Sequence, residues 1–322
     1  MAQTVTLTRR WPAQVEAHLQ SLYDLSVDTT DRPRTRDELA AALASADALC
    51  PTVTDRIDAD LLGSAEVRTR IIASFGVGHE HIDLDAARAR GIVVTNTPGV
   101  LTDCTADLTL ALLLGIARRI GEGEREVRGG SWTGWRPTHM MGTRVTGKTL
   151  GIVGLGRIGV AVARRARLGF GMRVLFHNPT PPPPERIAAA GAEPCSTLVE
   201  LLQRSDFVSL HCPATADTHH LINAERLAQM PAHAYLINTA RGTVVDSEAL
   251  ATALRERRIR GAGLDVYEGE PDVPAGLLEL DNVILLPHLG SATEETRTAM
   301  GMRVAENLAA FFAGSEPPDR LV

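Results

Sequence analysis

Short apolar runs alternate with amphipathic stretches along most of the 322-residue chain. Each run has the length of one buried strand, and the stretches between the runs have helical spacing. Regular alternation of this kind predicts βαβ units with parallel sheets, and therefore an α/β fold. The expected strands are residues 5–8, 48–50, 70–74, 92–95, 150–153, 173–177, 207–211, 235–238, 261–266 and 283–286. The expected helices are residues 13–22, 36–45, 84–90, 102–119, 157–168, 246–256 and 293–312.

Two of these helices carry further expectations. The helix at 102–119 is apolar on every face between Leu108 and Ile116. It needs cover on all sides, as at a domain junction or a subunit interface. At the start of the last helix, Ser291 and Glu294 have the spacing of a capping box. One apolar stripe follows along that helix, formed by Met300, Val304 and Leu308.

Two of the three tryptophans, Trp132 and Trp135, lie in a loop that also contains glycine and proline. Exposed aromatic rings on a loop indicate a contact with a partner. We expect that partner to be a second subunit or the substrate cleft of a neighbour. The alternative is that both rings fold back onto their own domain.

Composition argues against several classes of function. A net charge of −6 argues against nucleic acid or an anionic membrane as the main partner. The longest apolar run, residues 108–117, is about half of a membrane span. The four cysteines lie far apart without metal-ligand spacing, so we expect free thiols and no metal. Because residues 1–12 also lack a hydrophobic signal core, we expect a reducing cytoplasm.

The most informative stretch joins the strand at 150–153 to the helix that follows it. Its glycines have the spacing G-x-G-x-x-G at Gly154, Gly156 and Gly159. In a dinucleotide site the first permits a tight turn, the second lets a pyrophosphate approach the backbone, and the third lets the helix pack on the strand. The helix N-terminus adds N–H groups and a positive dipole end. An ordinary strand-to-helix turn is the alternative.

This turn predicts a doubly wound domain of the Rossmann type over residues 101–290. Residues 1–100 and 291–322 are expected to form a second doubly wound, flavodoxin-like domain that binds the substrate. In that domain, Gly76 and Gly78 directly follow a strand. Ligands bind beyond the carboxyl ends of strands in open α/β sheets, and the backbone N–H groups there suit a small carboxylate. A plain flexible turn explains this stretch equally well.

Three polar residues at strand ends suit the reduction of a carbonyl group. Arg241 can grip a carboxylate bidentately and polarise the carbonyl, because its guanidinium stays charged. His288 can protonate the developing alkoxide, since histidine titrates near neutral pH. Glu270 can stabilise the protonated imidazole. Each has a structural alternative: a surface arginine, a turn residue before Pro271 and a core histidine.

At this point the chain resembles the D-isomer-specific 2-hydroxyacid dehydrogenase family over nearly its whole length. The motifs that carry the resemblance are Gly154–Gly159, Asn238–Gly242, Gly263–Pro271 and Leu286–Thr293. Within the family, Trp132–Pro137 and Gly290–Thr293 are most similar to the glyoxylate/hydroxypyruvate reductases. The resemblance implies NAD(P)H-dependent reduction of a small 2-oxo acid to the 2-hydroxy acid, in a homodimer.

The resemblance also implies roles for individual residues. Arg241 would bind the carboxylate and carbonyl, and Glu270 with His288 would relay the proton. Asp265 would hold the nicotinamide carboxamide. The implied substrate contacts are Val77, Gly78, Trp135, Arg241 and Ser291. The implied cofactor contacts are Thr105, Gly154, Leu155, Gly156, Arg157, Ile158, Gly159, Asn178, Thr180, Cys212, Pro213, Thr218, Thr239, Ala240, Arg241, Asp265, His288 and Gly290.

The choice between NAD and NADP depends on Asn178, at the end of the second strand of the dinucleotide domain. An NAD-specific site usually has Asp or Glu there, which binds the ribose hydroxyls. The neutral Asn178 does not repel a 2′-phosphate and therefore favours NADP, although dual use stays open. The residues after it are prolines and Thr180 rather than the basic residue that similar reductases often have.

Two other functions share this fold. A nucleotide-sensing protein of the corepressor type retains the same Arg, Glu and His, but this chain has neither a long polar tail nor a basic patch. A dehydrogenase of another small anion, such as formate or phosphite, is the second alternative. Formate enzymes usually have Gln where Glu270 stands, which disfavours that version.

Overall fold

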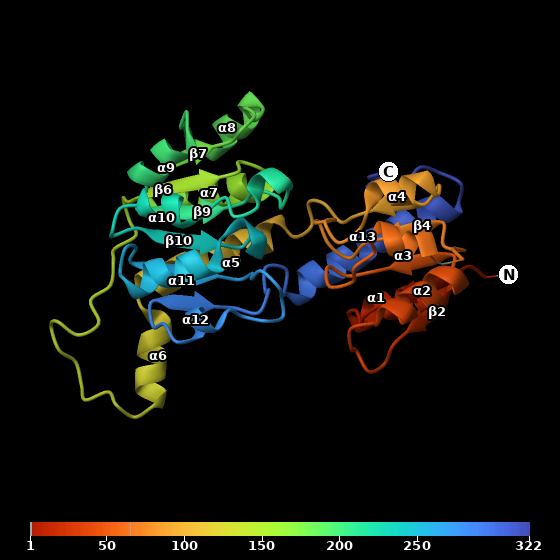
Figure 1. Cartoon of the computed structure of the whole chain (residues 1–322), viewed down its shortest axis with the longest axis horizontal. Helices are drawn as coiled ribbons and strands as arrows, with labels where there is room; N and C mark the ends of the chain where they lie inside the picture. The colour runs from red at the N-terminus through yellow and green to blue at the C-terminus, as the bar shows by residue number, and fades with distance from the viewer. Residues whose placement is uncertain (1, 65) are drawn as a thin grey trace. The chain divides into compact units, whose positions relative to one another are not determined.

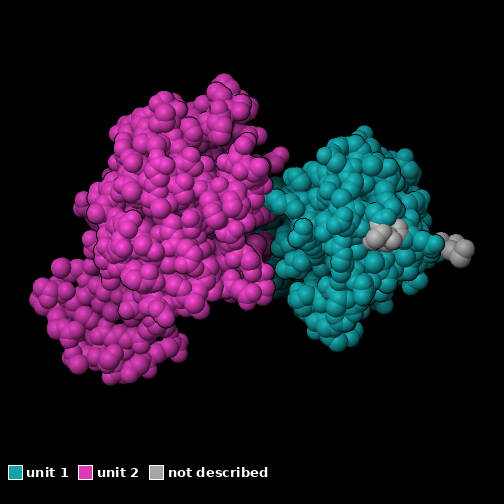
Figure 2. Space-filling view, in the orientation of Figure 1, with its two compact units in different colours: residues 1–101, 292–322 teal, residues 102–291 magenta. Residues whose placement is uncertain are grey.

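The structure is a computed structural model that describes residues 2–64 and 66–322. The chain divides into two compact units (Figures 1 and 2). Unit 1 comprises Met1–Leu101 and Ala292–Val322, and unit 2 comprises Thr102–Ser291. Among the described residues, no helix is both long enough and apolar enough to cross a membrane.

Unit 1 is built on a sheet of five parallel strands in the order β2-β1-β3-β4-β5. This is the flavodoxin-like order, so the fold expected for this unit is confirmed. The strands are β1 (Thr4–Leu7), β2 (Asp24–Val27), β3 (Ala48–Cys50), β4 (Ile71–Ala73) and β5 (Val93–Thr95). The helices are α1 (Ala13–Leu22), α2 (Arg36–Ser45), α3 (Ala59–Ser64), α4 (Leu84–Ala89) and α13 (Glu294–Phe312).

Helices cover both faces of this sheet, because successive side chains of a strand point to opposite sides. In β4, Ile71 packs with residues of α1 and α13, whereas Ile72 packs with residues of α2 and α3. Helix α13 returns to this unit at the end of the chain and buries its predicted stripe of Met300, Val304 and Leu308.

Unit 2 contains seven parallel strands in the order β12-β11-β10-β9-β6-β7-β8. Counted from β6, this is the Rossmann order 3-2-1-4-5-6 with a seventh strand at the edge, as expected. The strands are β6 (Thr149–Val153), β7 (Arg173–His177), β8 (Glu193–Pro194), β9 (Phe207–Leu210), β10 (Tyr235–Asn238), β11 (Gly261–Leu264) and β12 (Val283–Leu285). The strand order reverses between β6 and β9, which is where such sheets bind their ligands.

The helices of unit 2 surround this sheet (Figure 1). They are α5 (Thr102–Ala117), α6 (Ile120–Arg128), α7 (Arg157–Phe170), α8 (Pro184–Ala190), α9 (Leu198–Arg204), α10 (Ala224–Ala228), α11 (Ser247–Arg255) and α12 (Ala275–Leu278). Two 3₁₀ turns follow strand ends: η1 (Ala216–Thr218) after β9 and η2 (Gly242–Val244) after β10. Both turns contribute to the sites described below.

Some expectations differ from the structure. Thr293 caps α13 by accepting a hydrogen bond from Thr296 N at 3.2 Å, so the capping box proposed for Ser291 and Glu294 is wrong. The helix at 102–119 stops at Ala117 because Arg119 adopts a left-handed conformation with φ 55°. Several elements were not among the expected segments: β2, β8, α3, α6, α8, α9, α10 and α12. Strand β2 alternates exposed and partly buried residues over only four positions, and α6 buries none of its residues.

Candidate active site

The glycine turn after β6 is packed tightly against the end of β9. Gly154 has φ 96°, and a Cβ there would lie 2.8 Å from the backbone of His211 and Cys212. A Cβ at Gly159 would lie 2.4 Å from Gly154 O. Both positions therefore require glycine, the first for its conformation and its contact and the second for helix packing.

Gly156 requires a different explanation. It has φ −80°, which any residue can adopt, and a Cβ built on it meets nothing within 4 Å. It is also the N-cap of the 14-residue helix α7, and no side chain caps that end. Open space beside an uncapped helix N-terminus fits a phosphate group. These residues therefore fit the pyrophosphate of a dinucleotide, with Arg157 and Ile158 in the first turn of the helix.

Asn178, after β7, is hydrogen-bonded to this turn. Its Oδ1 accepts a hydrogen bond from Leu155 N at 2.7 Å, whereas the Leu155 side chain is fully buried. Because an N–H can donate only to the oxygen of the amide, the contact fixes the orientation of Asn178. Its Nδ2 donor group therefore points away from the glycine turn. Thr180, two residues further on, is exposed.

Glu270 and His288 meet at the ends of β11 and β12. His288 Nδ1 lies 2.7 Å from Glu270 Oε2, and Glu270 Oε1 accepts a hydrogen bond from Tyr267 N at 2.9 Å. Burial raises the pKa of Glu270, but the hydrogen bond and charge of His288, the hydrogen bond from Tyr267 N and the charge of Arg241 together outweigh it, and the pKa falls below its ordinary value. The carboxylate is thus held in the ionised form that stabilises a protonated imidazole.

A buried carboxylate positions the loop that carries His288. Asp265 is 1% exposed and accepts hydrogen bonds from Leu289 N at 2.6 Å and Gly290 N at 2.8 Å. Burial raises the pKa of Asp265, and these two bonds offset only part of that shift. His288 itself has φ 55°, a conformation that a non-glycine residue keeps only where its surroundings impose it.

The turn with Arg241 is held by a residue whose role sequence reasoning missed. Asn238 is 1% exposed, donates from Nδ2 to Arg241 O at 2.9 Å and accepts from Ala240 N at 3.0 Å. Gly242, which follows Arg241, touches the loop after β11, since a Cβ there would lie 1.8 Å from Tyr267 C. Glycine at this position therefore brings the Arg241 turn against the loop that carries Glu270.

Tyr267 is a second missed residue. Its hydroxyl donates to Leu286 O at 2.9 Å, and its ring is buried. It thereby links the loop of Glu270 to the segment just before His288. Asn238 lies in the motif Asn238–Gly242 and Tyr267 in the motif Gly263–Pro271, and that position was the only signal in the sequence. Their hydrogen bonds depend on loop conformation, which residue spacing does not give.

Several other predicted cofactor contacts in unit 2 form hydrogen bonds within the protein. Thr105 donates to Gly290 O at 2.9 Å, and the hydroxyls of Thr109 and Thr239 lie 2.9 Å apart. Thr218 donates to Pro213 O at 2.7 Å. Burial raises the pKa of Cys212 to about 11, so its thiol is not activated. All four cysteines are free, as expected.

In unit 1, the loop after β4 is held by a buried amide. Asn96 donates from Nδ2 to Val77 O at 2.7 Å, and Thr97 N donates to Gly76 O at 2.9 Å. Gly78 is buried in the same loop. The loop is therefore anchored rather than a plain flexible turn, while its role in carboxylate binding stays a prediction.

The two tryptophans predicted to contact a partner are exposed in unit 2. Trp132 is 53% exposed and Trp135 is 82% exposed, so neither ring folds back onto its own domain.

A groove of about 790 Å³ lies between α5 and α7. Arg157 lines the groove, but Arg241, Glu270 and His288 do not. The groove is a separate feature from the strand-end site.

Comparisons with known proteins agree with this geometry. The model of the D-isomer specific 2-hydroxyacid dehydrogenase NAD binding domain matches residues 110–290. A glyoxylate reductase from Thermococcus litoralis is 46% identical, over 99% of this chain and 96% of its own length. An NADPH-dependent glyoxylate/hydroxypyruvate reductase from Sinorhizobium meliloti, solved with NADP and malonate, is 35% identical with a TM-score of 0.88; the match covers 100% of this chain and 97% of that one.

A glyoxylate reductase structure from Paecilomyes thermophila is also similar, at 34% identity and a TM-score of 0.88, over 99% of this chain and 98% of that one. The family model spans most of unit 2, and the curated relative is similar along nearly the whole chain. The chain therefore belongs to the D-isomer specific 2-hydroxyacid dehydrogenase family and is an NAD(P)-dependent oxidoreductase.

Proposed function

We propose that this protein reduces glyoxylate or hydroxypyruvate to the corresponding 2-hydroxy acid. The observation that carries the proposal is the Glu270–His288 pair, whose Oε2 and Nδ1 atoms lie 2.7 Å apart. The loop of Glu270 packs against the Arg241 turn. The similarity to glyoxylate reductases over nearly the whole chain supports the choice of substrate.

The side chains supply what carbonyl reduction needs. When bound, the reduced dinucleotide supplies a hydride to the carbonyl carbon. Arg241 binds the substrate carboxylate and polarises the carbonyl. His288 donates its proton to the carbonyl oxygen as the alkoxide forms, and Glu270 stabilises the protonated ring until then. His288 is 35% exposed, so solvent can restore its proton after each turnover.

A kinetic panel tests the proposal. Glyoxylate, hydroxypyruvate and pyruvate are each measured with NADPH and with NADH, by the loss of reduced-cofactor absorbance. We expect turnover of glyoxylate or hydroxypyruvate that exceeds turnover of pyruvate. If no 2-oxo acid is reduced with either cofactor, the proposed function is wrong, and the corepressor-like or other-anion alternatives replace it.

For the cofactor, NADPH is the preferred form in this proposal. Asn178 has no negative charge, and its Oδ1 is already bound to Leu155 N, so the Nδ2 donor is the polar group left for the ribose side. Asn178→Asp retains the acceptor for Leu155 N but adds a charge that repels a 2′-phosphate. The ratio of kcat/KM for NADH to that for NADPH should rise about tenfold or more, corresponding to about 1.4 kcal/mol. An unchanged ratio would rule out Asn178 as the determinant.

The two units have separate roles in this proposal. Unit 2 binds the dinucleotide through the Gly154–Gly159 turn, with Asp265 and the other contacts implied by the resemblance. Unit 1 contributes Val77 and Gly78 to the substrate carboxylate, and Ser291, at the end of unit 2, is a further substrate contact. Because the contacts of Val77 and Gly78 are expected to be backbone contacts, Asn96→Ala, which removes the hydrogen bond that anchors Val77 O, should raise KM for the 2-oxo acid without changing KM for NADPH.

The protein functions as a homodimer in this proposal. Helix α6 and the loop after it carry an unusual number of exposed apolar side chains, which a monomer rarely displays together. They are Ile120 (58% exposed), Val127 (61%), Trp132 (53%), Trp135 (82%) and Met141 (62%). Helix α5 also leaves Leu108 and Leu114 only partly buried within unit 2. Light scattering on the purified chain should give twice the monomer mass, and Val127→Glu should weaken the dimer; a monomeric wild-type protein would contradict this.

A further inference from the structure

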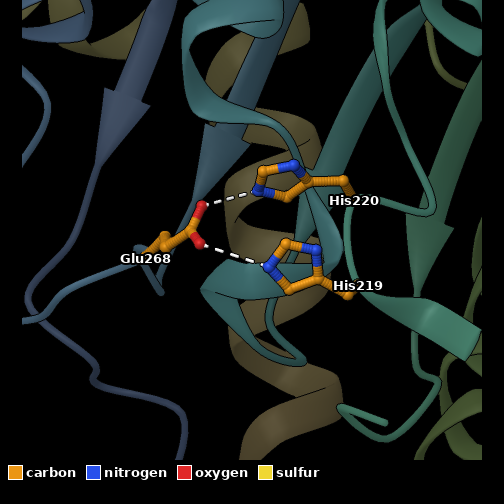
Figure 3. Close-up of side chains that lie close together, drawn as sticks. All are labelled: His219, His220 and Glu268. Carbon is orange, nitrogen blue, oxygen red and sulfur yellow. Dashed lines mark hydrogen bonds and ion pairs between the residues drawn. The ribbon is translucent and has the colours of Figure 1, made fainter. Parts of the chain in front are cut away.

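A second group of histidine and carboxylate side chains lies in unit 2, outside the Glu270–His288 pair. His220 Nε2 lies 2.8 Å from Glu268 Oε2, and His219 Nε2 lies 3.5 Å from Glu268 Oε1 (Figure 3). The two imidazole rings stack with their centroids 4.0 Å apart. Both therefore turn the same ring nitrogen toward a single carboxylate, as Figure 3 shows.

We propose that His219, His220 and Glu268 together bind one divalent transition-metal ion, with Zn²⁺ as the expected ion. Their ligand atoms all lie within 4.8 Å of one another. Zn²⁺ binds histidine nitrogen and carboxylate oxygen at about 2.0–2.2 Å, so tetrahedral ligands lie about 3.4 Å apart. The observed separations of 2.8 and 3.5 Å bracket that value, and small side-chain rotations bring the atoms around an ion.

The chemistry of the three ligands favours this class of ion. Imidazole nitrogen suits Zn, Ni and Cu, whereas Mg and Ca take oxygen ligands. Two histidines and one glutamate supply three protein ligands and leave a fourth position for water. His219 is exposed and the other two residues are partly buried, so an ion can enter from solvent.

The backbone holds both sets of ligands on a common support. His220 N donates to Thr243 O at 2.8 Å, and Ile222 forms a parallel bridge with Val245. The loop of Glu268 packs on the same segment through the contact between Tyr267 and Gly242. Residues 242–245 thus position two ligand-bearing loops that are 48 residues apart in sequence. An ion at this point would join the turn after η1 to the loop that leads to Glu270.

Strain at His220 is consistent with such a role. It has φ 48°, which a non-glycine residue rarely adopts, and this conformation places its ring beside that of His219.

Metal titration of the full-length protein tests the proposal independently of activity. After treatment with EDTA and its removal by gel filtration, the protein is titrated with Co²⁺, which reports its coordination by visible absorption, and Zn²⁺ is then added as competitor. We expect one equivalent of Co²⁺ in a low-coordinate site and its displacement by Zn²⁺. Zn²⁺ should also raise the Tm of the wild-type protein, because it binds the folded state.

Variants locate the site. Glu268→Gln, His219→Asn and His220→Asn should each weaken Co²⁺ binding at least tenfold and abolish the rise in Tm. His233→Asn is the matched control, since His233 also pairs with a carboxylate, that of Asp206 at 2.9 Å, but has no second histidine. His288→Asn is a second control, for the catalytic pair. Both controls should bind Co²⁺ as the wild type does.

Two results would overturn the proposal. One is wild-type protein that shows neither Co²⁺ absorption nor a Zn²⁺-dependent Tm. The other is binding that all three site variants retain, or that His288→Asn removes. If one site variant fails to fold, which circular dichroism reveals, the other two still decide the outcome. Failure of the metal site leaves the kinetic panel unaffected, so the two proposals are tested separately.

Discussion

Glu268 and Glu270 stand two residues apart on one loop, and each pairs with histidine in a different way. Glu270 binds Nδ1 of one histidine, His288, so that Nε2 is the ring nitrogen left for a substrate. Glu268 faces Nε2 of two histidines, His219 and His220. The same residue types therefore suit a proton donor in one place and an ion in the other.

The supports of the two clusters differ as well. His288 is mounted on a loop that the buried Asp265 holds by two backbone hydrogen bonds, and Tyr267 binds the segment before it. His219 and His220 lie on a short turn at the surface of unit 2. The clearest difference between the two clusters is the ring nitrogen that faces the carboxylate, which is Nδ1 in His288 and Nε2 in His219 and His220.

The largest expected effect comes from removing the proton donor. His288→Asn should lower kcat for glyoxylate by about 10³-fold, within the range for loss of a general acid. Asparagine tolerates the left-handed backbone at this position, so Tm should change little. Steady-state kinetics and thermal unfolding measure both quantities. A loss of less than about tenfold would assign the proton to another group.

A smaller effect should follow from replacing the carboxylate of the same pair. Glu270→Gln should lower kcat by about 10–100-fold, because the ring keeps a hydrogen-bonding partner but loses the charge that stabilises its protonated form. The same variant should bind Co²⁺ as the wild type does. Loss of Co²⁺ binding in Glu270→Gln would show that the two clusters are one site.

Tyr267 tests whether the support matters beyond the pair itself. Tyr267→Phe removes the donor to Leu286 O and leaves that carbonyl without its partner, at a cost of about 1–2 kcal/mol. Tm should fall by about 2–6 °C, and kcat should fall several-fold while KM for NADPH stays constant. An equal change in KM and kcat would indicate general loosening of unit 2 rather than misplacement of His288.

The smallest effect concerns a histidine that pairs with no carboxylate in the described chain, His211, whose Nε2 lies 2.8 Å from Ser209 Oγ. Burial lowers the pKa of His211 to about 3, so the folded protein holds it neutral. The unfolded chain takes up this proton below about pH 6.5, and wild-type stability therefore falls as pH falls from 6.5 toward 3. His211→Gln should be less sensitive to acid. The difference in Tm between wild type and variant should shrink by a few degrees from pH 7 to pH 5, and a constant difference would contradict the assignment.

Much of the fold could be predicted because its signals are periodic. The buried strands appear as apolar runs, and Gly154 and Gly159 are glycines for steric reasons that hold locally. The edge strand β2 alternates exposed and partly buried residues over only four positions, and helix α6 buries none of its residues although it carries Ile120 and Val127. Neither element therefore has the buried apolar run that marks the other strands and helices. The predicted capping box of α13 was wrong because Ser291 and Thr293 are both residue types that cap helices. Only the backbone conformation shows that Thr293 is the N-cap.

The candidate site was predictable in residue types but not in contacts. Strand ends identified Arg241, Glu270 and His288 as candidates. The hydrogen bonds of Asn238 and Tyr267, and the bond from Leu155 to Asn178, depend on loop conformations that have no sequence period. The cluster around Glu268 joins residues 48 positions apart without metal-ligand spacing, so the sequence predicted no metal there.

A double-mutant cycle on kcat/KM for glyoxylate, with Glu270→Gln, His288→Asn and the variant that carries both changes, tests the central claim most directly. If Glu270 acts through the ring of His288, the double variant should be about as slow as His288→Asn alone, because the carboxylate has no imidazole left to stabilise. Losses that simply multiply in the double variant would contradict the assignment of this pair as the proton donor.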